Sequence, residues 1–392
     1  MTLFGIIWLI YLLYCISRKG YYHILCCLLL AMVLQCDNIV VLGETGIGPQ
    51  VVTSLVFITY YLIKNHFCIK INRQNKLALL GIFVLSIPIF RSVNIENILR
   101  IIMLFSYIVT AYLLSTLSGE ITEEELYIAL YRTTLIVLII GFTEMLMTSG
   151  IVPRIWLFRT FIYNDIVNSQ FYLPIVRFFS TFQEASYCAP FLIAMFFYFL
   201  ETHNSRKSFN YILALLILAI ILTFSTTAYV CFLVILFLWA LYSQNRKAKK
   251  IIIPLSILGL VFMATFGYSI IENVIINKMS SGSGVTRSNW NRSAIQAFQS
   301  SIIWGTGYKT QRASSLMYTL LAELGVVGFF GYVIFNLGLV LKKGEPLIRK
   351  SSLMIISGVI CCFIACPDVD LCSYWLIVYI VRLMESQTIR ST

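Results

Sequence analysis

The chain has 392 residues, of which 59% are hydrophobic and only 12% are charged. A soluble domain of this length cannot bury so much apolar surface, so the composition excludes a water-soluble enzyme and indicates a membrane protein. The formal net charge of +12 does not indicate nucleic acid as a partner, because the basic residues fall between apolar segments, where they orient a protein in the lipid bilayer.

Apolar runs of roughly 20 residues recur along the chain, and this length crosses a hydrocarbon core of about 30 Å. We therefore predict an all-α polytopic integral membrane protein with about 12 to 13 transmembrane helices, in a single membrane domain over residues 1–392. The first run ends at Arg18 and Lys19 without a small-residue cleavage site, which is typical of a retained span. The run 211–242 is too long for one helix, so we expect a tight reversal at Ser225. The predicted spans are residues 2–17, 21–42, 46–63, 77–90, 98–117, 127–148, 185–201, 210–224, 227–242, 251–268, 315–341, 351–366 and 371–384.

The distribution of positive charge predicts which loops face the cytoplasm. Most of the 29 lysines and arginines lie in alternate loops and in the C-terminal tail, which places those segments inside and the N-terminus outside. Ten basic residues remain on the opposite face, and eight of them lie in two long outer loops, residues 149–184 and 269–313. Cations are normally sparse on that face, so the two loops predict an anionic ligand.

The first outer loop ends in a cluster of polar residues. Aromatic side chains such as Trp156 suit a short helix at the membrane interface. Arg177, Ser180, Thr181 and Glu184 then lead into the next span. A guanidinium binds phosphate oxygens in pairs, and a carboxylate can orient or deprotonate a sugar hydroxyl. The structural alternative is that Arg177 pairs with Glu184, while the hydroxyls cap the following helix.

The second outer loop predicts a helix that starts near Thr286, which can act as its N-cap. At about 100° per residue, Arg287 and Trp290 lie on one apolar face, whereas Arg292 points roughly 140° away from Arg287. We therefore expect Arg287 to face inward. A buried arginine needs an anionic partner, which is the physical argument for a ligand here. Arg292 is expected to be solvated or near lipid headgroups.

Two glycines follow this helix and precede the next span. Gly305 and Gly307 allow close backbone approach, and exposed amides beside Lys309 and Arg312 could cradle an anion. Such a pair of glycines is equally compatible with a simple turn. Glu323 then lies inside a span, where a carboxylate is costly and indicates either function or pairing with another helix.

The 11 cysteines lie almost entirely inside the predicted spans and resemble small buried hydrophobes. Their spacing matches no zinc-binding pattern, so the sequence predicts no metal site and no cofactor.

These motifs resemble the O-antigen polymerase and ligase superfamily of bacterial inner membranes. The resemblance rests on Arg177 through Ser186, and on the order Arg287, Trp290, Gly305, Gly307 and then Glu323 before a glycine. It implies a GT-C-like, metal-independent, inverting glycosyltransferase with its active side in the periplasm. Its substrates would be oligosaccharide repeat units on undecaprenyl pyrophosphate.

The resemblance also implies roles for the candidate residues. Arg177 and Arg287, together with Arg312, would hold the donor pyrophosphate, and Glu184 would orient or deprotonate the acceptor hydroxyl. The remaining candidates are substrate-binding residues. They are Ser180, Thr181, Trp290, Gly305, Gly307, Lys309 and Glu323.

Two departures from the family pattern bear on the reaction. The ligase carries a histidine just before the span with the intramembrane glutamate, and this chain has none in either outer loop, which favours a polymerase of surface polysaccharide. Many members also have an arginine after the serine at the tight reversal, where this chain has Thr226. The alternatives are the ligase and a transporter or flippase of lipid-linked sugars. A chain-length regulator as an additional partner stays open, as do the sugars joined.

Overall fold

The computed structural model describes residues 1–35, 37–42, 45–69, 76–94, 97–117, 119–149, 177–202, 208–242, 254, 282–341 and 349–388. These residues are predominantly helical, with one short antiparallel hairpin. The elements, in chain order, are α1 (Leu3–Ser17), α2 (Tyr22–Val33), β1 (Val40–Leu42), β2 (Thr45–Ile47), α3 (Pro49–Lys64), α4 (Lys76–Arg91), α5 (Ile98–Leu114), α6 (Glu123–Thr148), α8 (Ala185–Glu201), α9 (Ser208–Leu222), α10 (Thr226–Tyr242), α13 (Gly282–Ser300), α14 (Leu316–Val340), α15 (Lys350–Ala365) and α16 (Cys372–Thr388).

The helices are consistent with the predicted all-α membrane protein. Residues Glu123–Met147 and Leu316–Val340 are long and apolar enough to cross a bilayer, and most of the remaining helices are shorter and apolar. Apart from two segments, each predicted span coincides with a helix whose ends lie within four residues of the predicted ones. The break between α9 and α10 confirms the interruption that the sequence predicts near Ser225. The predicted span 251–268 and the aromatic part of the first outer loop lie outside the described residues.

The prediction of one span over residues 21–42 is wrong. Helix α2 ends at Val33, and Val40 then pairs with Ile47 in the antiparallel hairpin of β1 and β2. The polar side chains Gln35, Asp37 and Asn38 interrupt the apolar run here, and such residues favour turns over helix interiors.

The structure divides into two compact units, and each is described by itself. Unit 1 comprises residues 1–74, 102–225 and 370–392, and unit 2 comprises residues 75–101 and 226–369. In unit 1, α2 packs against α1, α3, α6 and α16, and α8 packs against α9 and α16. Helix α8 is buried on every side from Ala185 to Phe199, as expected for a helix that is apolar all round.

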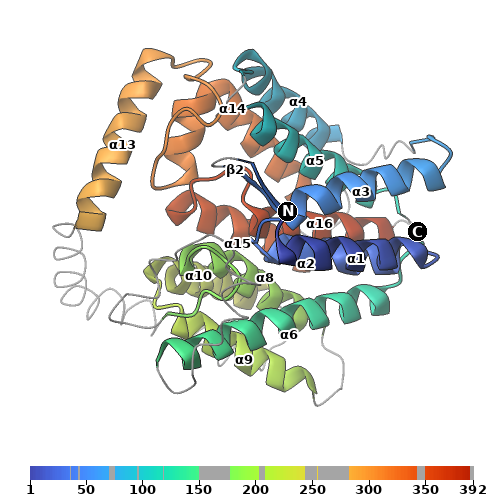
Figure 1. Ribbon diagram of the computed structural model, residues 1–392. Helices are drawn as coiled ribbons and strands as arrows, with labels where there is room; N and C mark the ends of the chain where they lie inside the picture. The colour runs from blue at the N-terminus through green and yellow to red at the C-terminus, as the bar shows by residue number, and fades with distance from the viewer. Residues whose placement is uncertain are drawn as a thin grey trace. The chain divides into compact units, whose positions relative to one another are not determined.

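Unit 2 is built around α14, which packs against α4, α13 and α15 (Figure 1). Helices α4 and α14 approach closely because glycines line their contact. A Cβ atom on Gly331 would lie 2.5 Å from the backbone nitrogen of Leu85. Gly81 meets the backbone of Phe335, and Gly338 meets that of Ala78. Small residues at such seams let membrane helices pack through their backbones.

Helix α14 is broken at Gly325, where φ is +64° and ψ is −166°. The segment after α13 fills the break with hydrogen bonds. The amides of Val326 and Val327 donate to the carbonyls of Ile302 and Ile303, over 2.9 and 3.2 Å. Irregular backbone in a membrane helix requires such partners, because lipid provides none. The break therefore fixes the chain immediately before the candidate site.

Candidate functional site

The candidate site in unit 2 is the segment from residue 304 to residue 312, which we call the glycine loop. The amides of the two glycines, and of Thr306 between them, are used within the protein. Gly305 donates to Ser301 (2.8 Å), Thr306 to the Ala322 carbonyl (2.9 Å) and Gly307 to the Glu323 carbonyl (2.9 Å). The prediction that exposed amides at the two glycines cradle an anion is therefore wrong. The glycines serve close approach instead, because a Cβ atom on Gly305 would collide with the Glu323 backbone.

The far end of the glycine loop carries a guanidinium stacked on an indole. The Arg312 guanidinium carbon lies 4.5 Å from the centre of the Trp290 ring, within the range of a cation–π interaction. Both the Ser314 amide and its hydroxyl donate to the side-chain oxygen of Asn291, which docks this end of the loop on α13. Arg312 is exposed, so its charge faces outward from a fixed position.

Helix α13 presents its small residues inward and its arginines outward. It begins at Gly282, earlier than the predicted N-cap Thr286. Ala294 and Ala297 are buried with Ala313 and Ala322, whereas Ile295 and Ile302 are exposed. The prediction that Arg287 is buried is wrong, since it is exposed in the first half of this helix. The buried part of α13 is therefore a narrow stripe of alanines, and Ile295 lies outside it.

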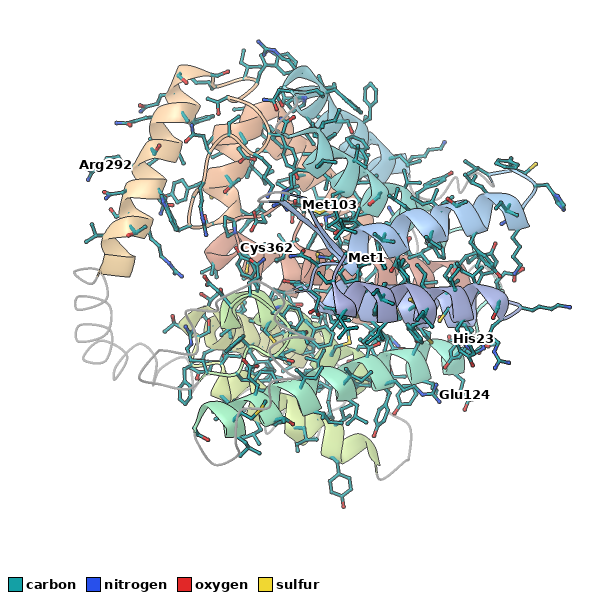
Figure 2. All side chains as sticks on the ribbon, viewed as in Figure 1. Met1, His23, Met103, Glu124, Arg292 and Cys362 are labelled. Atoms are coloured by element: carbon teal, nitrogen blue, oxygen red, sulfur yellow. The ribbon has the colours of Figure 1, made fainter. Side chains whose placement is uncertain are left out.

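The second arginine of α13 behaves as the sequence predicts. Arg292 is exposed, and Figure 2 shows its side chain pointing away from the helix on its outer side. It therefore offers a surface control for the residues of the glycine loop.

Lys309 forms an ion pair with Asp368. Its Nζ atom lies 2.7 Å from Oδ1 of Asp368, with the two side chains 23% and 36% exposed. Its backbone has φ of +62°. Nothing in the sequence links Lys309 to Asp368, because the two residues are 59 positions apart in the chain. Lys309 thus brings less net charge to the loop than its residue type suggests.

Glu323 lies at the break in α14 and is 1% exposed. Its carbonyl accepts the Gly307 amide, so the residue joins the glycine loop to the broken helix through its backbone. Tyr308 is also buried, and its carbonyl accepts from the Asn97 side chain over 3.1 Å.

In unit 1, Arg177 binds the end of a helix. Its Nε donates to the Thr223 carbonyl over 2.9 Å and its Nη2 donates to the Phe224 carbonyl over 3.3 Å. The amide of the next residue, Phe178, donates to Leu222 over 2.8 Å. The final carbonyls of α9 have no partner within the helix, and Arg177 satisfies the carbonyls that follow them.

The hydroxyls of Ser180 and Thr181 are buried and hold two helices. Ser180 donates to the Val137 carbonyl of α6 and Thr181 to the Val33 carbonyl of α2, each over 2.6 Å. Ser180 has φ of +52°. These bonds fix the segment between Arg177 and α8.

Glu184 is the N-cap of α8 and is half-buried. Its carboxylate accepts a hydrogen bond from the Ser186 hydroxyl over 3.2 Å. Unit 1 thus gathers Arg177, Ser180, Thr181 and Glu184 in one ordered segment, and unit 2 gathers Trp290, Lys309 and Arg312 around the glycine loop.

A sequence profile of the family described as "O-Antigen ligase" matches residues 211–333. No curated protein and no solved structure matches the chain. The matched segment includes α10, α13, the glycine loop and the break at Gly325.

Proposed function

We propose that the chain is a surface-polysaccharide polymerase. It joins oligosaccharide repeat units that are linked to undecaprenyl pyrophosphate. The match at residues 211–333 supports membership of the O-antigen polymerase and ligase superfamily, as the motifs predicted. The observation that supports this most is the glycine loop, which lies within the matched segment and holds Arg312 on Trp290.

The reaction is a glycosyl transfer with inversion. A hydroxyl oxygen of the acceptor repeat unit attacks the anomeric carbon of the growing glycan. The bond from that carbon to the pyrophosphate oxygen breaks, and undecaprenyl pyrophosphate leaves with the bonding electrons. The hydroxyl proton passes to a base, for which Glu184 is the proposed residue. Arginine charge stabilises the leaving pyrophosphate as its negative charge develops.

Within unit 2, we assign the pyrophosphate to exposed cations at the glycine loop. Arg312 is held with its guanidinium stacked on an indole, so the N–H groups in its plane are directed outward. Arg287 remains a proposed ligand, now as an exposed residue on the same helix as Trp290. Lys309 contributes through its position in the loop, with its charge balanced by Asp368.

Within unit 1, Glu184 is half-buried at the start of α8 and can accept a proton. Ser180 and Thr181 support the segment through their bonds to helix carbonyls. Arg177 stays a proposed pyrophosphate ligand on the sequence pattern, with two of its N–H groups bound to carbonyls.

The ligase is the second candidate, because the matched profile carries that description. It performs the same chemistry on a different acceptor, the lipid A core. The absence of histidine from both outer loops in the sequence favours the polymerase. We further propose a GT-C-like arrangement of about 12 to 13 spans in the bacterial inner membrane, with the two outer loops in the periplasm.

Glycan length in cells tests this assignment. Cells that carry Arg287→Ala or Arg312→Ala are compared with a deletion strain and with Arg292→Ala, a matched arginine on the same helix. A polymerase predicts lipopolysaccharide that collapses to core plus one repeat unit, because ligation continues. Loss of every repeat, with polymer retained on its lipid carrier, would indicate the ligase. Unchanged ladders in both variants, with normal expression, would exclude the pyrophosphate role and favour a transporter.

A further inference from the structure

Arg91 is brought to the glycine loop by the fold. It is the last residue of α4, and its guanidinium carbon lies 5.5 Å from the centre of the Trp304 ring. Trp304 is the first residue of the glycine loop, directly before Gly305. Nothing in the chain spacing of more than 200 residues indicates this contact. The loop thus has an arginine stacked on a tryptophan at each end.

The position of Arg91 is fixed by its neighbours in unit 2. The Ser92 hydroxyl accepts the Tyr308 amide over 3.0 Å. The Asn97 side chain donates to the carbonyls of Ser92 (2.8 Å) and Tyr308 (3.1 Å). A Cβ atom on Gly307 would lie only 3.0 Å from Ser92 Cβ. The end of α4 and the glycine loop are therefore held together through hydrogen bonds that are buried or partly buried.

The chemistry of a stacked guanidinium points to an anionic ligand. The indole covers one face of the group, whereas the five N–H donors lie in its plane and are not used by the stack. Arg91 is exposed, and within the described part of the chain no carboxylate forms an ion pair with it. The loop amides at residues 305–308 already donate to protein acceptors. These four amides are therefore not available to an anion, which leaves the side chains of the loop and of Arg91 as the ligands that we consider.

We propose that Arg91, stacked on Trp304, binds a phosphate group at the glycine loop, in the role that the proposed function gives to Arg312 at the other end. Phosphate is the acceptor that matches a planar guanidinium best, because two parallel N–H groups meet two oxygens. The assignment of that phosphate to the pyrophosphate of the lipid carrier rests on the proposed function. The headgroup of a bulk anionic phospholipid has the same chemistry and is the second source to be tested.

Binding measurements on the purified full chain test the proposal without catalysis. Radiolabelled undecaprenyl pyrophosphate, free of glycan, is titrated onto the protein in neutral detergent micelles, and bound lipid is counted after affinity capture. A parallel titration uses labelled phosphatidylglycerol. The matched control is Arg100→Ala, which removes an exposed arginine in the first turn of α5. Arg91→Lys is included to show whether a positive charge at the end of α4 is enough for normal thermal stability.

Arg91→Ala is expected to weaken binding about tenfold or more, the usual effect of losing a charge-assisted hydrogen bond, while Arg100→Ala binds as the parent does. Loss confined to undecaprenyl pyrophosphate identifies the carrier. Loss confined to phosphatidylglycerol supports phosphate binding but assigns it to a headgroup. Equal binding of both lipids by Arg91→Ala and Arg100→Ala, with thermal stability unchanged, would overturn the proposal.

The double variant Arg91→Ala with Arg312→Ala shows whether the two arginines share one ligand. Two cations on the same pyrophosphate interact, so the combined loss should differ from the product of the single losses. A combined loss equal to that product would mean that each arginine binds a separate phosphate. None of these binding measurements requires turnover. If the glycan ladder shows that the chain is not a polymerase, the binding result for Arg91 therefore still stands on its own.

Discussion

Gly305 and Gly325 lie face to face across the break in α14, and a Cβ atom on Gly325 would come within 2.6 Å of the Gly305 nitrogen. With φ of +64° and ψ of −166°, Gly325 also adopts a backbone conformation that is essentially confined to glycine. The two residues together hold the glycine loop in the broken helix.

Gly325→Ala is therefore expected to destabilise the protein by about 2–3 kcal/mol, from backbone strain and steric overlap combined. Thermal unfolding in detergent measures the loss. Gly20→Ala is the control, because Gly20 has φ of +106° with nothing near its missing Cβ. Gly20→Ala should lose stability through backbone strain alone, on the order of 1 kcal/mol. Equal losses in the two variants would mean that the contact with Gly305 contributes nothing.

Trp290→Ala should lower glycan polymerisation in cells by roughly tenfold, because Arg312 loses the ring that orients it. Trp290→Phe retains a ring that binds a cation more weakly, so its glycan polymerisation is expected to lie between that of the parent protein and that of Trp290→Ala. The proportion of long chains on a lipopolysaccharide gel is the measurement, with membrane expression as its control. Normal chain length in Trp290→Ala would show that Arg312 needs no stack.

Lys309 and Asp368 should prove to be a structural pair. Because the two side chains are 23% and 36% exposed, their coupling is expected to be only about 0.5–1 kcal/mol. A double-mutant cycle of Lys309→Met and Asp368→Asn, followed by thermal unfolding, gives that value. Strictly additive losses would indicate that Lys309 acts on a substrate and not on Asp368.

Asp37 should make stability depend on pH. It follows α2, is 1% exposed, and neither of its oxygens has a hydrogen-bond partner among the described residues. Burial raises the pKa of the Asp37 carboxyl well above its ordinary value. The folded state therefore keeps this proton at pH values where the unfolded chain has released it, so stability is complete below about pH 4 and falls as pH rises towards the raised pKa.

Asp37→Asn removes this titration. It should stabilise the protein more at pH 8 than at pH 5, as measured by the unfolding temperature in detergent at each pH. A constant difference across that range would contradict the buried neutral carboxyl. Asp368→Asn, at a paired and partly exposed site, is the matched substitution for comparison.

Arg177→Ala is expected to cost about 1.5–3 kcal/mol, because the Thr223 and Phe224 carbonyls lose a charged donor. Arg177→Lys retains the charge but not the two-pronged geometry, so it should recover only part of the stability. Unfolding temperature and glycan length are measured on the same preparations. Short glycans with full stability in Arg177→Ala would place the residue at the substrate instead of at α9.

Most of the helices were predictable from the sequence because they are apolar runs separated by polar or charged segments. The hairpin of β1 and β2 was not predicted, because the apolar residues Ile39 to Leu42 continue the hydropathy of α2. Only a short polar interruption, at Gln35, Asp37 and Asn38, marks the end of α2 in the sequence. Periodicity also overestimated the buried face of α13. It placed Arg287 on that face, whereas Arg287 is exposed and the buried residues are Ala294 and Ala297.

The candidate site was predictable where its parts are neighbours in sequence, as in the segment from Arg177 to Glu184 and in the glycine loop. Contacts between distant segments left no such signal. The Arg91 stack on Trp304 and the Lys309 pair with Asp368 both join elements far apart in the chain. The hydrogen bonds of the loop amides were also not predictable from the sequence, because Thr306 and Gly307 donate to carbonyls of α14 close to its break.

The glycine loop, whose amides at residues 305–308 are bound to protein acceptors, has a backbone scaffold that does not depend on its charged side chains. The positions that carry charge or aromatic rings can then change without disturbing the backbone, so different glycans could be accommodated by exchanging side chains on an unchanged frame. Affinity that resides only in exposed guanidinium groups should also respond to ionic strength, since dissolved salt screens such charges far more than it weakens buried amides.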